Sequence, residues 1–147
     1  MTKEKSKAAS KTKAVSNKVS ILDLVDYNKP IKYELKHPVS GAGLGVTFDL
    51  VSIESDKSNE VFRSHLLQPN IEKKMTGEGR LTVGMQVARE RIAASIVDWD
   101  FNGNILEEGD EAEPKPTLEN KLKLLSKDWI YKQLDAQVGS LSNFTKS

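Results

Sequence analysis

The chain contains no cysteine, few aromatic residues and no long apolar run. Without cysteine it cannot form a disulfide, a thiolate nucleophile or a sulfur-ligated zinc site. With two histidines in the chain, imidazole chemistry would have to use His37 or His65. No apolar run reaches the roughly 20 residues of a membrane-spanning helix, and Ile21–Asp26 is too short and too acidic for a signal-peptide core. We therefore expect a cytoplasmic protein with no membrane segment.

The length and composition of the chain are typical of a single domain. Of the 147 residues, 37% are apolar and 29% are charged, which is enough apolar content for a core at this length. The 22 basic residues nearly balance the 21 acidic ones, and the net charge is +1. This balance argues against a generally basic surface for nucleic acid.

Positive charge is concentrated in residues 1–19. Six lysines and one glutamate give this segment a net charge of +5, so the remaining 128 residues carry −4. Because it has almost no large apolar side chain to offset its ordering entropy, we expect a disordered lysine-rich arm. The segment lacks arginine and aromatic residues, which disfavours nucleic-acid binding and leaves electrostatic contact with an acidic partner as an alternative to a solvated tail.

The patterning after residue 20 predicts an α+β fold. Apolar residues alternate with polar ones over 31–36 and again over 46–50, which predicts a β-hairpin spanning 31–53 with a glycine-rich turn and a bulge. Helices are expected from Ser55-Asp56 to a stop at Pro69, and over 81–96. Two more are expected, one capped by Thr117 and one ended by Gly139. We expect an N-terminal β-hairpin packed on a small bundle of three to four helices, with one domain over 20–140 and a flexible C-terminal tail over 141–147.

Two motifs invite a ligand-binding interpretation. The cluster Gly41–Gly45 leads into a strand, whereas a phosphate loop needs a following helix, so a hairpin turn is favoured. Asp98, Asp100 and Asn102 match the opening of a calcium loop, but Gly109 stands where the bidentate glutamate belongs. A tight Asn-Gly turn at residues 102–103 is the simpler interpretation, and calcium binding remains an alternative.

Catalysis finds little support in the sequence. His37 precedes a proline at a strand end, and His65 lies on an expected amphipathic helix, where a structural role is commoner than that of a base. The acidic residues between 107 and 113 lie in a solvated loop that offers no apolar pocket. We therefore expect no enzyme activity, no catalytic residues, no cofactor and no metal, and we expect a binding protein instead.

Several short motifs occur in an order that resembles the tail assembly chaperones of long-tailed bacteriophages, over about residues 36–145. They are His37-Pro38-Val39-Ser40-Gly41, a glycine-led strand, Ser55-Asp56, Ile96-Val97-Asp98-Trp99 at a helix end, Thr117, Glu119-Asn120, Leu124-Leu125, Trp129-Ile130, Gln133-Leu134 and Asn143-Phe144. The lysine-rich arm is not part of this pattern.

The resemblance implies a protein of phage morphogenesis, present in the bacterial host cytoplasm and absent from the mature virion. Such chaperones bind the tape measure protein and recruit tail tube proteins, and self-association of several copies is expected. Many also exist in a longer, frameshifted form, whose slip would lie near residues 143–147. Support or contact roles are expected for Trp99, Leu122, Leu125, Trp129 and Phe144. The position of Phe144 beyond the last helix, among polar residues, predicts an exposed anchor or a loosely docked tail. The alternatives are a structural tail or neck component and a small calcium- or nucleic-acid-binding module.

Overall fold

The computed structural model describes Lys18 and residues 20–67 and 77–145, with the backbone alone for residues 77–82. The rest of the predicted arm and the helix stop at Pro69 lie outside the described residues. In chain order the elements, with η for a 3-10 helix, are η3 (Ile21–Asp23), β1 (Ile31–Lys36), β2 (Gly43–Leu50), α1 (Asp56–Leu66), α3 (Gly77–Ser95), β3 (Ile96–Asp100), α4 (Leu118–Leu125), α5 (Asp128–Val138) and η4 (Leu141–Phe144). This mixture confirms the α+β class.

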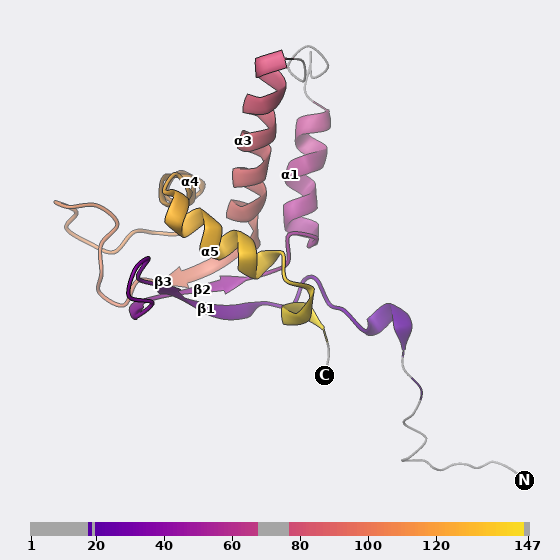
Figure 1. Cartoon of the computed structure of the whole chain (residues 1–147), viewed down its shortest axis with the longest axis horizontal. Coiled ribbons are helices and arrows are strands. Elements are labelled where there is room, and N and C mark those ends of the chain that lie inside the picture. Colours follow the sequence, from indigo (N-terminus) through magenta and orange to yellow (C-terminus); the bar gives the residue numbers. More distant parts are fainter. Residues whose placement is uncertain (1–17, 19, 68–76, 146–147) are drawn as a thin grey trace, which may run out of the picture.

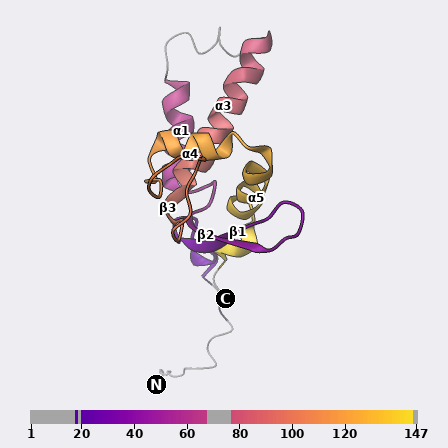
Figure 2. The same cartoon turned by 90° about the vertical axis from the view of Figure 1, so that its left-hand side faces the viewer.

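The strands form an antiparallel sheet in the order β1-β2-β3. Figures 1 and 2 show α4, α5 and the lower end of α3 over one face of this sheet. Helices α1 and the upper part of α3 stand away from the sheet as a projecting pair. The molecule therefore has a layered body and an α1–α3 hairpin that leaves it.

The predicted β-hairpin is present as β1 and β2, with Tyr33 opposite Phe48. The glycine cluster shapes its turn and the start of β2, as the hairpin interpretation requires. Gly41 adopts a positive φ of 75°, and a Cβ atom at Gly43 would collide with the carboxylate of Glu34. That carboxylate accepts a hydrogen bond from the Gly45 N–H at 3.1 Å.

The prediction that Ile96–Trp99 ends a helix is wrong, because these residues begin β3. Helix α3 ends at Ser95, whose hydroxyl donates to the carbonyls of Arg91 and Ser52. Ile96 then lies opposite Leu50 on β2. A register shift between Asp49 and Leu50 breaks the period-2 burial of β3, which hid the strand in the sequence.

The predicted helix starts at Ser55 and Thr117 are confirmed. The Ser55 hydroxyl accepts from the Ser58 N–H at 3.4 Å, and the Thr117 hydroxyl accepts from the Asn120 N–H at 3.2 Å. Helix α5 gives way to Gly139 as expected. Helix α3 begins at Gly77, earlier than expected. Each glycine lowers helix stability by only about 1 kcal/mol, so the glycines at its start do not prevent helix formation.

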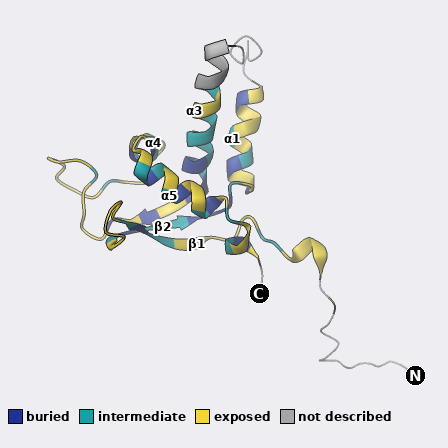
Figure 3. Cartoon of the chain, viewed as in Figure 1, coloured by how far each residue is buried: buried dark blue, intermediate teal, exposed yellow. Residues whose placement is uncertain are grey.

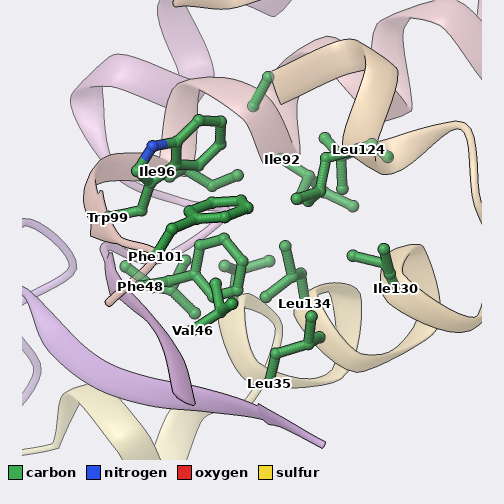
Figure 4. Close-up of a cluster of buried hydrophobic side chains, with 14 residues drawn as sticks. Leu35, Val46, Phe48, Ile92, Ile96, Trp99, Phe101, Leu124, Ile130 and Leu134 are labelled. Carbon is green, nitrogen blue, oxygen red and sulfur yellow. The ribbon is translucent and has the colours of Figure 1, made fainter. Parts of the chain in front are cut away.

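The core lies between the sheet and the helices above it (Figure 4). Phe48, Leu50 and Leu134 are fully buried there, and β1, β2, β3, α3, α4 and α5 all contribute side chains. Trp99 meets Phe48 and Phe101 edge to face, with ring centroids 6.1 and 5.1 Å apart. Burial of this cluster is the main stabilising contribution in the layered body.

Both ends of the described chain are fixed to the same side of the body. Val25 pairs with Thr145 in an isolated antiparallel bridge, and the Asp26 N–H donates to the Phe144 carbonyl at 2.9 Å. Phe144 is only 2% exposed, so the prediction of an exposed anchor there is wrong. The packed domain extends to Thr145, and the boundary expected at residue 140 is too early.

Candidate functional site

The five residues expected to support or contact a partner lie in or against the core. Trp99, Leu125 and Phe144 are buried, and the Trp99 indole N–H donates to the Pro114 carbonyl at 2.9 Å. Leu122 and Trp129 are partly buried and pack against the same core cluster. For the three buried residues, this placement favours support over contact. A partner would reach them only after local unfolding.

The calcium-like segment forms a turn. The carboxylate of Asp98 accepts from the Trp99 N–H at 2.9 Å, and that of Asp100 accepts from the Asn102 N–H at 2.8 Å. Asn102 and Gly103 have positive φ values of 54° and 90°, as a two-residue turn demands. Within residues 18, 20–67 and 77–145, no group of three or more histidine or acidic side chains could hold a metal.

The candidate functional site is instead an apolar pocket between α1 and α3, which we call the α1–α3 groove. Its volume is about 240 Å³. It is lined by apolar and small side chains, together with His65 and one arginine: Phe62, Leu66, Val83, Val87, Ala88 and Arg91. Gly84 leaves its part of the α3 wall without a side chain. The arrangement suits apolar side chains from outside.

The groove is open because the α1–α3 hairpin projects beyond the layered body. Figure 3 shows buried positions on the lower end of α3 and mostly exposed or intermediate ones along α1. Phe62 is 46% exposed and Leu66 is 51% exposed, although both are large and apolar. Contiguous exposed apolar surface of this kind often marks an interaction site.

One wall of the groove is held by Arg91. Its guanidinium donates to the Ile53 carbonyl at 2.8 Å and to Asn59 at 3.2 Å, and its Nε donates to the Ser58 hydroxyl at 3.3 Å. The same guanidinium lies 5.8 Å from the centre of the Phe62 ring. Arg91 therefore ties α3 to the start of α1 and holds the ring at the groove.

His65 joins the two helices at the groove. It is buried, and its Nε2 lies 3.2 Å from the Glu90 carboxylate. Glu90 also accepts from the Gln86 amide at 2.8 Å, one helical turn earlier. This chain of polar contacts aligns α1 with α3, in keeping with the structural role expected for His65.

Side chains occupy backbone groups on both outer strands. On β1, the Gln133 amide oxygen accepts from the Tyr33 hydroxyl at 2.8 Å and the Lys36 N–H at 2.9 Å, while its nitrogen donates to the Lys36 carbonyl at 2.9 Å. On β3, Lys121 donates to the Ile96 carbonyl at 2.7 Å. Burial, followed by the charge of Lys57, lowers the pKa of Lys121. These contacts occupy the backbone of one residue at the end of each edge strand, Lys36 on β1 and Ile96 on β3.

The sequence contained a weak signal for this groove. Phe62 and Leu66 are four residues apart, but that spacing is equally typical of a core-facing stripe. The small residues Gly84 and Ala88, one turn apart on the next helix, are compatible with an open groove wall. The pattern does not indicate that, among the described residues, no further layer covers α1 and the upper part of α3.

Among the described residues, none of the helices is both long and apolar enough to cross a membrane. No family model, curated protein or solved structure matches the chain.

Proposed function

We propose that the chain is a tail assembly chaperone of a long-tailed bacteriophage, a non-enzymatic protein that binds the tape measure protein through the α1–α3 groove. The observation that carries this proposal is the open groove itself, with Phe62 and Leu66 half exposed at its rim. The order of the sequence motifs between residues 36 and 145 supports a tape measure protein as the partner, with the exception of Ile96–Trp99, which lies in β3 and does not end a helix. Tail tube subunits are recruited to the same complex, in the host cytoplasm and before the virion is complete.

The groove matches the chemistry of such a client. A tape measure protein is a long helix-former with an apolar stripe, which aggregates when that stripe is exposed to water. An amphipathic helix docks into a hydrophobic groove through side chains at helical spacing. Docking of a helix is favoured because the exposed apolar side chains Phe62 and Leu66 lie in the groove between two helices.

The experiment is co-expression of the tape measure protein from the same genome with this chain carrying an affinity tag. We expect the partner to be insoluble alone and to be captured in a soluble complex when the two are made together. Phe62→Ser and Leu66→Ser should each reduce capture by about ten-fold, as expected for anchor residues of an interface. Leu118→Ser is the matched control, because Leu118 is also half exposed but lies on α4, away from the groove.

Two outcomes contradict the proposal. Equal capture by Leu66→Ser and Leu118→Ser would move the binding site away from the groove. If the partner stays insoluble with this chain and also with an in-frame extended form, the chaperone function is wrong. Mass spectrometry of purified virions then tests the alternative, since a structural tail or neck component remains in the particle.

A further inference from the structure

The turn that follows β3 contains an exposed asparagine–glycine pair. Asn102 and Gly103 have positive φ values of 54° and 90°, and both residues are exposed. The turn is closed by the Asn104 N–H, which donates to the Phe101 carbonyl at 2.9 Å. Because glycine has no side chain, nothing on residue 103 shields its backbone nitrogen from the amide of residue 102. The pair is therefore open both to water and to attack of one residue on the other.

Neither of the two groups that would react is engaged elsewhere in the described part of the chain. The backbone N–H of Asn102 donates to the Asp100 carboxylate at 2.8 Å, which holds the backbone of the turn. The side-chain amide of Asn102 makes no hydrogen bond within residues 18, 20–67 and 77–145, and the N–H of Gly103 has no acceptor there. An amide carbon and a neighbouring nitrogen are thus left without competing contacts.

Asn104, in the same turn, differs from Asn102 in both respects. Its side-chain nitrogen donates to the Leu44 carbonyl at 3.2 Å and to the Phe101 carbonyl at 2.9 Å, so its amide is held in place. Ile105 follows it, and a β-branched side chain crowds the backbone nitrogen that would have to attack. The turn therefore contains a matched asparagine in which the same reaction is disfavoured.

We propose that Asn102 is a site of spontaneous covalent modification, at which the side-chain amide is hydrolysed through a cyclic imide. The Gly103 nitrogen loses its proton and attacks Cγ of Asn102, and the new N–Cγ bond closes a five-membered ring. The Cγ–Nδ2 bond breaks, and the amide nitrogen leaves with a proton as ammonia. Water then opens the ring. Cleavage of the N–Cγ bond gives aspartate, whereas cleavage of the bond between this nitrogen and the Asn102 carbonyl carbon gives isoaspartate.

The two products change the turn in different ways. Aspartate keeps the backbone path and tolerates a positive φ, but it adds a negative charge beside the Asp100 carboxylate. Isoaspartate carries the backbone through Cβ and Cγ, so the turn becomes one atom longer. The hydrogen bond between the Asn104 N–H and the Phe101 carbonyl belongs to a two-residue turn, and we expect the longer path to break it. The isoaspartyl form should therefore unfold at a lower temperature than the aspartyl form.

The test is incubation of the folded full chain at mildly alkaline pH, followed by peptide mapping with mass spectrometry. Fragment ions should show that residue 102 shifts from the amide mass to the acid mass while Asn104 keeps its amide. Labelling by an isoaspartyl methyltransferase should detect the isoaspartyl product. Conversion should be faster at higher pH, because the attacking nitrogen must lose its proton.

Asn102→Gly is the matched control, since two glycines suit the same two-residue turn, and this variant should lose the conversion completely. Circular dichroism checks that the variant and the incubated wild type are folded. Conversion of the urea-denatured chain without conversion of the folded chain overturns the proposal, because the turn would then protect the pair. Equal conversion of Asn104 and Asn102 also overturns it. These measurements do not use the tape measure protein, so their outcome is independent of the proposed function.

Discussion

The layered body and the α1–α3 hairpin use apolar residues in opposite ways. In the body, Phe48, Trp99 and Leu134 are covered on all sides by the sheet and by α3, α4 and α5. In the hairpin, Phe62 and Leu66 pack at the edge of two helices and keep about half of their surface in water. Residue type therefore does not separate the two regions, since a phenylalanine is buried in the body and another is half exposed in the α1–α3 hairpin; what differs is the cover that each receives.

The substitution expected to lower the unfolding free energy most lies in the layered body. Phe144→Ala should lower the free energy of unfolding by about 3–5 kcal/mol, because it removes a buried ring and leaves a cavity. Urea denaturation followed by circular dichroism measures this change. The control is Leu141→Ala, at an exposed position on the same short helix, which should change it by about 0.5 kcal/mol or less. Equal effects would return Phe144 to the flexible tail first expected.

A smaller effect is expected at the edge of the sheet. Gln133→Leu removes the amide that pairs with Lys36 and Tyr33, and should cost about 1–3 kcal/mol by leaving partly buried polar groups without a partner. The same denaturation experiment applies, with Ala136→Ser as an exposed control on α5. A neutral result would mean that water replaces the amide and that β1 is not protected by it.

The N-cap residues of α1 and α4 allow the α1–α3 hairpin and the layered body to be compared by the same kind of substitution. Ser55→Ala and Thr117→Ala should each cost about 1 kcal/mol in unfolding free energy. The loss should be greater at Ser55, because Ser55 and Ser58 are buried and water cannot replace the lost hydrogen bond, whereas Thr117 is exposed. A greater loss at Thr117 would contradict the assigned difference in burial.

The smallest effect on stability is expected in the groove. Leu66→Ser should change the unfolding free energy by only about 0.5 kcal/mol, since the side chain is half exposed already. The same substitution is expected to reduce client capture strongly, so stability and binding separate at this position. A large loss of stability would assign Leu66 to the core and remove the contrast between hairpin and body.

Local signals in the sequence predicted most of the elements. The β1–β2 hairpin was predicted from the alternation of apolar and polar residues. The starts of α1 and α4 were predicted from Ser55 and Thr117, whose side chains accept hydrogen bonds from N–H groups three residues later. The third strand was missed because a register shift disturbs its alternation. The burial of Phe144 was missed because the backbone partners that fix its segment, Val25 and Asp26, lie near the other end of the described chain.

The candidate site was harder to predict for a related reason. Whether a helix face is core or groove depends on what covers it, and coverage is a property of the three-dimensional arrangement. The sequence indicates the apolar stripe of α1, but it does not show that the described part of the chain places no layer over it. Trp99 and Trp129 were expected to support or to contact a partner, and the structure places both in or against the core.

The bridge between Val25 and Thr145 also constrains when the protein folds. During synthesis, the sheet strands β1 and β2 leave the ribosome long before α5 and η4, which supply Leu134, Val138 and Phe144 to the interior. The apolar face of the β1–β2 hairpin therefore stays exposed to water until the last described residues emerge from the ribosome. Contacts so distant along the chain raise the contact order and slow folding. Until those residues emerge, the nascent chain exposes the apolar face of the sheet, as aggregation-prone folding intermediates do.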